Sequence, residues 1–454
     1  MRTACLALAL AGLAQASDFH TGQAARAVIG QPSFSAREAG INANALSLNR
    51  GKLYAAENNR VLAFDVANPC AICGLAPVSV INQSVMRGVA AVAVSGKVVV
   101  MADAAGHRVL IWRNTTPNAN VIGPMQPDVV LSGVIEPVSV AYDGRRLFVG
   151  DASQHRVFIW NALPSIDSQA PDATLGQTDN AVGAAAVGTP AALASDGTNL
   201  FVADTENRRI LVFSAGDIDL SENDILNSAT LLPTSFAPGT LVTIRTSGAT
   251  ADSETAETTD GSENLPTKLA GVEVYLNGNA LPLLSVSPEE IQAQLPYDLG
   301  AGTSGSLYLR SAALVSSAAE VRFASASPGI FAIGKMEPRS GLLLHASEEA
   351  IVDGAPAQGA PITADLPAVP GERVTVWANG LGFMGNDAAL PVHALINGEP
   401  AEVVSARLPK GAVGIYEVVI ALPRHFVPGQ EARLQLVQNS IPSNTVIFPV
   451  QVAQ

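Results

Sequence analysis

Short runs of alternating apolar and polar residues fill the first half of the chain, and one arrangement of them occurs four times. In each copy an apolar run ends in an acidic residue, and a second apolar run begins at an arginine a few residues later. The arginines are Arg60, Arg108, Arg156 and Arg209, which lie 48, 48 and 53 residues apart. A repeat of this length that is built from short strands predicts a β-propeller.

The repeats predict several strands for each propeller blade. The two central strands are expected at 53–57 and 59–64, 98–103 and 107–112, 147–151 and 155–160, and 200–204 and 208–213. Before two of these pairs, Asp143-Gly144 and Asp196-Gly197 predict hairpins with type I′ turns, in which both residues have positive φ. A further strand ends in Gly-Gln at 27–31 and at 174–177. We expect the segment 27–31 to complete the last blade and so to close a ring of four or five blades.

The acidic residue and the arginine of each repeat keep a regular spacing. In three copies they are five residues apart: Asp103 and Arg108, Asp151 and Arg156, and Asp204 and Arg209. In the first copy Glu57 replaces the aspartate, three residues before Arg60. With this signature, residues 18–216 resemble the NHL-repeat propellers. We expect each acid–arginine pair to be a structural contact that holds a loop.

After residue 216 the repeat disappears and a different duplication begins. Segment 238–244 matches 370–376, 272–278 matches 393–398, 291–296 matches 416–423, and 316–323 matches 443–448. Each copy consists of short alternating strands and contains one Asn-Gly hairpin signal. This pattern predicts two immunoglobulin-like β-sandwiches, at 224–332 and 333–454. The fold class expected for the whole chain is therefore all-β.

The first of these sandwiches carries a further resemblance. The segments 225–230, 237–244, 265–272 and 284–291, with the ending Ser327-Pro-Gly-Ile-Phe331, resemble a domain found at the C-terminus of exported soil-bacterial proteins and the TIG-type immunoglobulin-like fold. That resemblance implies an architecture and no defined activity. The acidic stretch 246–263 predicts a solvated loop, with a calcium site as the alternative.

Charge and the N-terminus bear on where the protein acts. Arg2, the apolar run 5–13 and Ala14-Gln-Ala16 predict a secretory signal peptide at 1–16, and no later apolar run is long enough to span a membrane. A formal net charge of −14 argues against binding nucleic acid. We therefore expect a secreted, periplasmic or cell-surface protein. In such an oxidising compartment Cys70 and Cys73 are expected to form a small structural disulfide.

Two histidines offer the sharpest candidate chemistry. His107 and His155 occupy matching positions in consecutive repeats, and together with Asp103 and Asp151 they suggest a metal site as one alternative. The matching residue of the last repeat is Arg208, which would repel a cation. The chain contains no nucleophile elbow, zinc-protease helix or P-loop motif. The sequence therefore assigns no metal, no cofactor and no catalytic residue.

The leading hypothesis is a non-enzymatic exported binding or scaffolding protein whose propeller face binds a protein, peptide or glycan. The candidate binding residues are turn residues that recur on one rim: Asn58, Asn59, His107, His155, Glu206 and Arg208. One alternative is a propeller lyase or hydrolase with a metal in its channel. Another is a structural protein of cell-surface assemblies. The identity of the ligand and the oligomeric state stay open.

Overall fold

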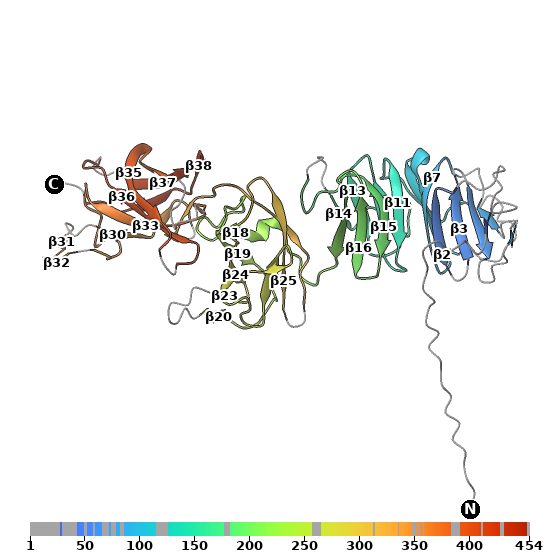
Figure 1. The fold of residues 1–454 in the computed structure, drawn as a ribbon, viewed down its shortest axis with the longest axis horizontal. Coiled ribbons are helices and arrows are strands. Elements are labelled where there is room, and N and C mark those ends of the chain that lie inside the picture. The colour runs from blue at the N-terminus through green and yellow to red at the C-terminus, as the bar shows by residue number, and fades with distance from the viewer. Residues whose placement is uncertain are drawn as a thin grey trace, which may run out of the picture. The chain divides into compact units, whose positions relative to one another are not determined.

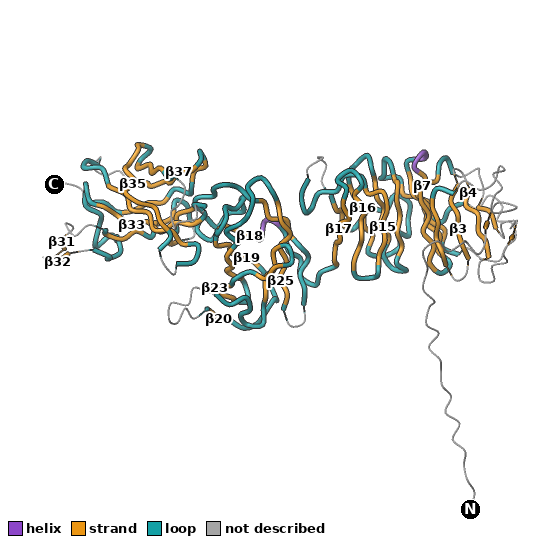
Figure 2. The backbone as a smooth tube through the Cα atoms, in the orientation of Figure 1, coloured by secondary structure: helices purple, strands orange, loops and turns teal. Residues whose placement is uncertain are grey.

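A computed structural model of the chain shows an all-β protein, as the sequence predicts. Strands carry the fold throughout the described residues, and the helical elements there are two short 3-10 turns, η1 (Ala104–Gly106) and η2 (Glu222–Asp224) (Figures 1 and 2). The structure describes residues 28–29, 43–49, 52–57, 60–65, 72–73, 79–81, 86–114, 126–176, 182–256, 265–311, 314–334, 336–346, 351–352, 355–356, 358–382, 391–409, 412–426 and 431–451.

Four successive antiparallel sheets occupy the repeat region, and we call them repeat sheets 1 to 4. Sheet 1 consists of β2 (Ala45–Asn49), β3 (Lys52–Glu57), β4 (Arg60–Asp65) and β6 (Ser79–Ile81). Sheet 2 consists of β7 (Val89–Ser95), β8 (Val98–Asp103), β9 (Arg108–Trp112) and β10 (Val129–Leu131). Sheet 3 consists of β11 (Pro137–Tyr142), β12 (Leu147–Asp151), β13 (Arg156–Trp160) and β14 (Ala173–Leu175). Sheet 4 consists of β15 (Pro190–Ser195), β16 (Asn199–Asp204) and β17 (Arg209–Ser214).

The predicted turn type is wrong at both Asp-Gly hairpins. Gly144 and Gly197 have positive φ, but neither aspartate does. Instead, Asp143 accepts hydrogen bonds from the N–H groups of Arg145 and Arg146, and Asp196 accepts the equivalent pair from Thr198 and Asn199. The side chain thus organises the turn, and the Asn199 donors lower the pKa of Asp196 to about 2.

The N-terminal strand does not complete the last repeat sheet, so the predicted ring closure is wrong. β1 (Val28–Ile29) pairs in parallel with β5 (Ile72–Cys73), and sheet 4 has three strands in the described part of the chain. Ile29 packs against the apolar side chains of sheet 1, where Leu62 and Phe64 are buried. This contact removes apolar surface of Ile29 from water, which favours the position of β1 beside the first repeat.

Each repeat sheet has two apolar faces, because successive residues of a strand point to opposite sides. We call forward the face that carries the first and third residues after the repeated arginine, and backward the opposite face. Val61 and Ala63, on the forward face of sheet 1, share a core with Leu110 and Trp112, on the backward face of sheet 2. The neighbouring sheets 1 and 2 therefore pack forward face onto backward face, and β7 also contacts β11 of sheet 3.

The sheets after residue 216 form two regions, each with its own core. In the first C-terminal region two sheets bury their inner side chains in one cluster that extends from Ile218 to Phe323. Its first sheet has the order β18 (Ile225–Asn227), β19 (Leu241–Arg245), β24 (Glu290–Gln294), β23 (Leu283–Val286) and β20 (Glu254–Thr255). Its second sheet has the order β22 (Asn279–Ala280), β21 (Glu273–Leu276), β25 (Ser304–Arg310) and β26 (Ala319–Arg322).

The second C-terminal region encloses a core that begins at Ile330 and ends at Phe448. Its main path runs through β27 (Gly329–Ile330), β33 (Arg373–Asn379), β36 (Ile415–Ala421), β35 (Glu399–Arg407), β34 (His393–Ile396), β37 (Ala432–Gln438), β39 (Val446–Phe448), β29 (Arg339–Gly341) and β28 (Ala332–Ile333). β30 (Leu343–His345) pairs with β33, β38 (Ile441–Pro442) pairs with β37, and β31 (Ile351–Val352) pairs with β32 (Ala355–Pro356).

The two C-terminal regions share the strand pairing and the hairpin turns that their duplicated sequences suggest. β19 pairs with β24 as β33 pairs with β36, both antiparallel. Asn277 and Asn397 have positive φ, as do the glycines that follow them, which matches the type I′ turn predicted for both hairpins.

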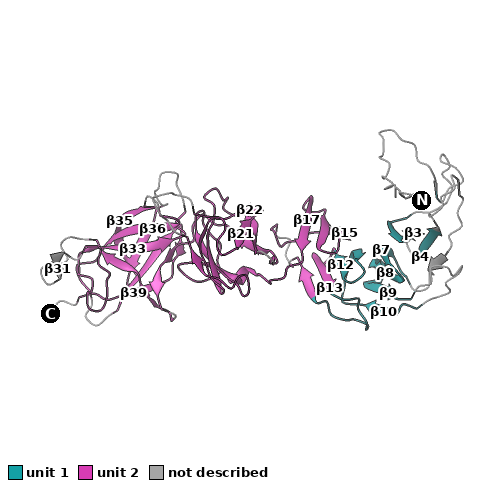
Figure 3. Cartoon of the chain, turned by 90° about the horizontal axis from the view of Figure 1, so that it is seen from below, with its two compact units in different colours: residues 1–151, 160–172 teal, residues 152–159, 173–454 magenta. Residues whose placement is uncertain are grey.

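Contacts divide the chain into two compact units at the third repeat sheet, not near residue 216 (Figure 3). One unit contains residues 1–151 and 160–172, and the other contains residues 152–159 and 173–454. Sheet 4 and both C-terminal regions therefore belong to the same unit. Among the described residues, no helix has the length and apolarity needed to cross a membrane.

Candidate functional site

The aspartate of the second, third and fourth repeats anchors the loop that leads into its own sheet. Asp103 is fully buried, and one carboxylate oxygen accepts hydrogen bonds from the N–H groups of Arg87 and Gly88, at 3.0 and 2.8 Å. The other oxygen lies 2.9 Å from Nε of Arg108. Asp151 accepts the equivalent loop contacts from Ile135 N and Glu136 N.

The last repeat shows the same arrangement with one more donor. Asp204 accepts hydrogen bonds from Gly188 N at 3.0 Å, Arg209 Nε at 2.9 Å and Asn207 Nδ2 at 2.9 Å. Burial by itself raises the pKa of the Asp204 carboxyl, but these hydrogen bonds outweigh burial and hold the pKa below its ordinary value. In the first repeat, Arg60 Nε lies 2.5 Å from a carboxylate oxygen of Glu57.

His107, His155 and Arg208 have the same backbone conformation in three successive repeats, with φ of 54°, 53° and 54°. His107 Nδ1 lies 2.5 Å from the carbonyl oxygen of Ile135, and His155 Nδ1 lies 3.1 Å from that of Gly188. Because a carbonyl only accepts, each Nδ1 must carry the proton. Each histidine thus ties its turn to the loop that enters the next repeat sheet.

Two of the predicted rim residues come together in the structure. Glu206 lies 3.8 Å from Nδ1 of His155 and accepts a hydrogen bond from the hydroxyl of Thr189. Arg208 is exposed, two residues after Glu206 in the sequence. Asn58 and Asn59 lie outside the described residues, as do the signal peptide 1–16, Cys70 and the side chain of Cys73. Within the described ranges, no three His, Cys, Asp or Glu side chains gather in a way that could hold a metal ion.

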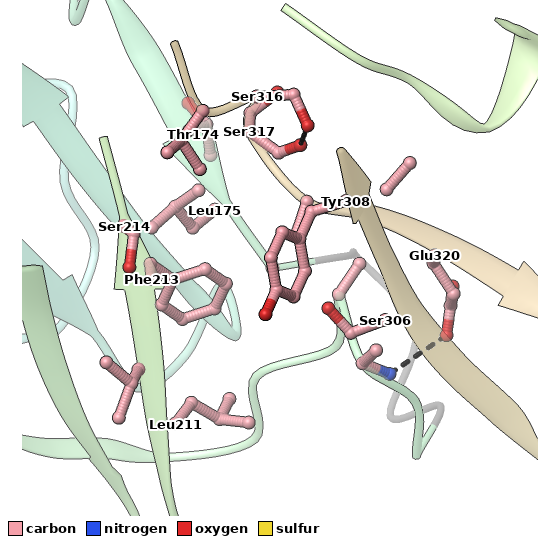
Figure 4. A pocket seen from close by; sticks show the side chains of 17 residues that line it. Thr174, Leu175, Leu211, Phe213, Ser214, Ser306, Tyr308, Ser316, Ser317 and Glu320 are labelled. Atoms are coloured by element: carbon pink, nitrogen blue, oxygen red, sulfur yellow. Dashed lines mark hydrogen bonds between the residues drawn. The ribbon is translucent and has the colours of Figure 1, made fainter. Parts of the chain in front are cut away.

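A pocket of about 580 Å³ lies elsewhere, between strands of repeat sheets 3 and 4 and the first C-terminal region (Figure 4). All of its lining residues belong to one compact unit. β14 contributes Leu175, β17 contributes Leu211 and Phe213, and β25 contributes Ser306 and Tyr308. Figure 4 shows Phe213 and Leu175 facing the ring of Tyr308. The volume is in the range of small-molecule sites, which is about 300–1,000 Å³.

Strand alternation places these side chains in the pocket. Along β25, Leu307 and Leu309 point into the core of the first C-terminal region, so Ser306 and Tyr308 point out of it. Phe213 occupies the repeat position of Trp112, which is completely buried in sheet 2. In sheet 4 the same position is half-buried, because it lines the pocket.

The rim of the pocket is held by hydrogen bonds. The N–H of Ala184 donates to the hydroxyl of Ser304 at 3.1 Å and to the carboxylate of Glu320 at 3.0 Å. Gly183 allows this close approach, because a Cβ there would meet the Glu320 carboxylate at 2.1 Å. The ring of Tyr308 stacks on Tyr275, with centroids 5.1 Å apart and planes inclined by 9°. The pocket wall is therefore preorganised.

A buried histidine, His345, lies in the second C-terminal region. Its side chain is buried, and Nδ1 lies 2.9 Å from a carboxylate oxygen of Glu372, whose other oxygen accepts Val369 N at 2.7 Å. His345 Nε2 is buried without a hydrogen-bond partner in the described structure. Glu372 lies 27 residues after His345 in the sequence, so the local sequence pattern did not predict that the two side chains are in contact.

Comparison with known protein families and with curated proteins found no match to this sequence. The pocket residues were missed by sequence reasoning, because they come from three distant segments. The sequence did offer one signal, because the alternation along 304–310 puts Tyr308 on the outward face of its strand. That alternation predicts a surface residue, but it does not predict which segment packs against it.

Proposed function

We propose that the chain is a non-enzymatic exported binding protein, in which the repeat sheets form an NHL-type propeller array and the C-terminal regions are immunoglobulin-like sandwiches. We further propose that the pocket between Phe213 and Tyr308 takes one neutral sugar unit of a glycan. The observation that carries this proposal is the pocket itself, with aromatic rings on two walls and hydroxyl groups beside them. Ligand sites commonly combine apolar walls with a few polar groups.

The chemistry of the lining favours a neutral ligand with both apolar and hydroxyl surfaces. A sugar ring presents a flat C–H face, which fits against an aromatic ring, and its hydroxyl groups can bond to Ser306 and Thr174 at the wall. The one carboxylate that lines the pocket, Glu320, already accepts Ala184 N and lies 3.4 Å from Arg322. A cationic ligand would have to compete with both contacts.

The test is binding of the full chain to a panel of neutral oligosaccharides and short peptides, followed by titration calorimetry of the best probe. Phe213→Ala and Tyr308→Ala are expected to weaken binding of an oligosaccharide by about tenfold or more. Phe201→Ala is the matched control, because Phe201 lies on the opposite face of the same sheet.

Each other outcome changes the assignment. Binding of peptides alone would refute the sugar ligand, and binding of neither probe class at millimolar concentration would refute a binding function for this pocket. A variant with both His155→Ala and Glu206→Ala completes the set. If it loses binding while Phe213→Ala retains it, the site is the predicted rim of the repeat region.

A further inference from the structure

Repeat sheet 4 lacks, in the described part of the chain, the fourth strand that completes each of the other three repeat sheets. In sheets 2 and 3 that strand, β10 or β14, is antiparallel to the strand that begins at the repeated arginine. After β17 the chain instead enters the first C-terminal region, where Ile218 and Leu220 are buried in the core. Among the described residues, the outer edge of β17 is therefore an open strand edge.

The backbone of β17 directs hydrogen-bonding groups toward this edge. The N–H of Ala215 donates to the carbonyl of Thr198, and from this bond the ladder between β16 and β17 alternates. The alternation points the N–H and C=O groups of Ile210, Val212 and Ser214 away from β16. The counterparts of Ile210 and Val212 in sheets 2 and 3 are residues that pair with the fourth strand.

The fourth strands of sheets 2 and 3 show what such an edge binds. Asp128, just before β10, accepts a hydrogen bond from the N–H of Arg113 at 2.6 Å. Asp172, just before β14, accepts one from the N–H of Asn161, also at 2.6 Å. Both donors hold the repeat position of Ser214, five residues after the arginine. Both fourth strands have the sequence Asp-x-x-Leu, so an extended segment of this kind suits the edge.

The pocket of Figure 4 lies where a fourth strand of sheet 4 would run. Its lining includes four successive residues of β17, 211–214, and such a wall is a strand edge, because alternate side chains point to opposite faces. A second wall is β14, which holds the fourth position in sheet 3, and a third wall carries Ser306 and Tyr308. An extended chain in this pocket would thus have the edge of β17 on one side and hydroxyl and aromatic groups on the other.

We infer that β17 binds an extended peptide as the fourth strand of sheet 4, and that this peptide carries the sugar unit proposed for the pocket. The ligand class is therefore a glycopeptide, and this inference rests on the proposed sugar site. Strand addition of this kind takes its affinity from main-chain hydrogen bonds and its specificity from alternate side chains.

The register of sheet 3 shows which peptide residue would carry the sugar. Thr174 is the middle residue of β14 and pairs with Phe158, whose counterpart in sheet 4 is Leu211. A threonine at the same position of the peptide would share the backward face with Leu211 and Phe213, which line the pocket. Its hydroxyl can then hold a sugar against Tyr308.

The probe is the peptide Pro-Asp-Ala-Thr-Leu-Gly, which repeats residues 171–176 of the chain. It is prepared unmodified and with glucose, galactose, mannose or N-acetylglucosamine on its threonine, and the methyl glycoside of each sugar is the free-sugar probe. In titration calorimetry with the full chain, one glycopeptide should bind at least about tenfold more tightly than its methyl glycoside or the unmodified peptide, because one ligand then makes both sets of contacts.

Val212→Pro tests the edge, because proline removes an N–H that faces the open edge and no bond to β16. This variant should bind the methyl glycoside like the unaltered protein, which shows that its pocket is folded, but should lose the gain from the peptide. Val212→Ala is the matched control, since it retains the N–H, and it should keep that gain. N-methylation of the probe leucine tests the same ladder without altering the protein and should also abolish the gain.

The outcomes separate this inference from the sugar site on which it rests. A glycopeptide that binds no more tightly than its methyl glycoside, or a gain that survives both Val212→Pro and N-methylation, would overturn strand addition and leave the sugar site in place. Binding of the unmodified peptide with no gain from any sugar would overturn the glycopeptide class. Absence of binding by every methyl glycoside and every glycopeptide would overturn both proposals.

Discussion

Asp204 illustrates how one buried side chain holds a repeat in shape. Its carboxylate joins the entry loop at Gly188 to Arg209 at the start of the last strand, and Asn207 in the intervening turn donates to the same group. A buried charge is tolerated only when donors surround it, and here three donors do so. The acid–arginine spacing is thus explained by a contact in three of the repeats, Glu57–Arg60, Asp103–Arg108 and Asp204–Arg209. In the third repeat, Arg156 Nε is instead buried without a hydrogen-bond partner in the described structure.

Replacing Asp204 by asparagine keeps the shape of the side chain but puts an N–H₂ group in place of one of the two oxygens that now accept hydrogen bonds. We expect Asp204→Asn to lower the free energy of unfolding by about 2–3 kcal/mol. Denaturant unfolding of the full chain measures this loss. Asp298→Asn, at an exposed position, is the control and should change the stability by less than about 0.5 kcal/mol.

The same carboxylate predicts how stability depends on pH. The folded protein holds the pKa of Asp204 below its ordinary value of 3.8, so the folded state binds this proton less readily than the unfolded state. The stabilisation from this group is therefore present above about pH 4 and is lost as the pH falls through the lower folded-state pKa. Unfolding of the unaltered protein and of Asp204→Asn between pH 7 and pH 2 should converge at the acid end. A constant difference would contradict this assignment.

At the scale of elements, short hairpins define the duplicated C-terminal regions. Asn277-Gly278 and Asn397-Gly398 both place two successive residues in the left-handed conformation. The asparagine side chains accept equivalent bonds, from Ser306 N in one copy and Arg433 N in the other. Since both turns use the same local chemistry, the sequence signal was sufficient to predict them.

Alanine at these glycines tests the conformational requirement of the turn without adding a steric clash. A Cβ at Gly278 or Gly398 would have no heavy atom within 4 Å. We expect Gly278→Ala and Gly398→Ala each to destabilise the protein by about 1 kcal/mol, since their φ values of 82° and 84° are unfavourable for a residue with a Cβ. Scanning calorimetry measures the effect. Gly133→Ala is the matched control, because it has the same free space without a positive φ, and an equal loss there would refute the conformational explanation.

At the scale of the whole molecule, a buried polar network joins the two C-terminal regions. Asn379 donates to the carbonyl of Leu241 at 2.8 Å and to Asn227 at 3.2 Å, and its own carbonyl oxygen accepts Leu241 N at 3.0 Å. Arg339 donates to the carbonyls of Ala229 and Thr230. Because buried polar groups are costly when unpaired, we expect these bonds to couple the unfolding of the two regions.

Asn379→Ala removes three bonds of this network and leaves the buried N–H and carbonyl of Leu241 without these side-chain partners. We expect a loss of about 3 kcal/mol and separation of the C-terminal unfolding transition into two steps, measured by scanning calorimetry. Asn223→Ala, at an exposed position, should leave the transition unchanged. A single unaltered transition in Asn379→Ala would show that the apolar cores alone couple the regions.

The features that could be read from the sequence are those set by neighbouring residues. Repeat length, the strands around Leu147–Asp151 and Asn199–Asp204, and the Asn-Gly turns depend on alternation and local conformational preference, and the structure contains them. The Asp-Gly turns were the exception, because the aspartate side chain competes with the backbone for the turn hydrogen bonds.

The remaining features required the tertiary structure, because they join segments that are far apart in the chain. The pairing of β1 with β5, the burial of His345 against Glu372 and the wall of Phe213 and Tyr308 are of this kind. Strand alternation puts Ile210 and Val212 on the same face of β17, but only the folded chain shows that both side chains are exposed in the described structure. A sequence determines which side chains a strand presents on each face, whereas packing decides what, if anything, covers them.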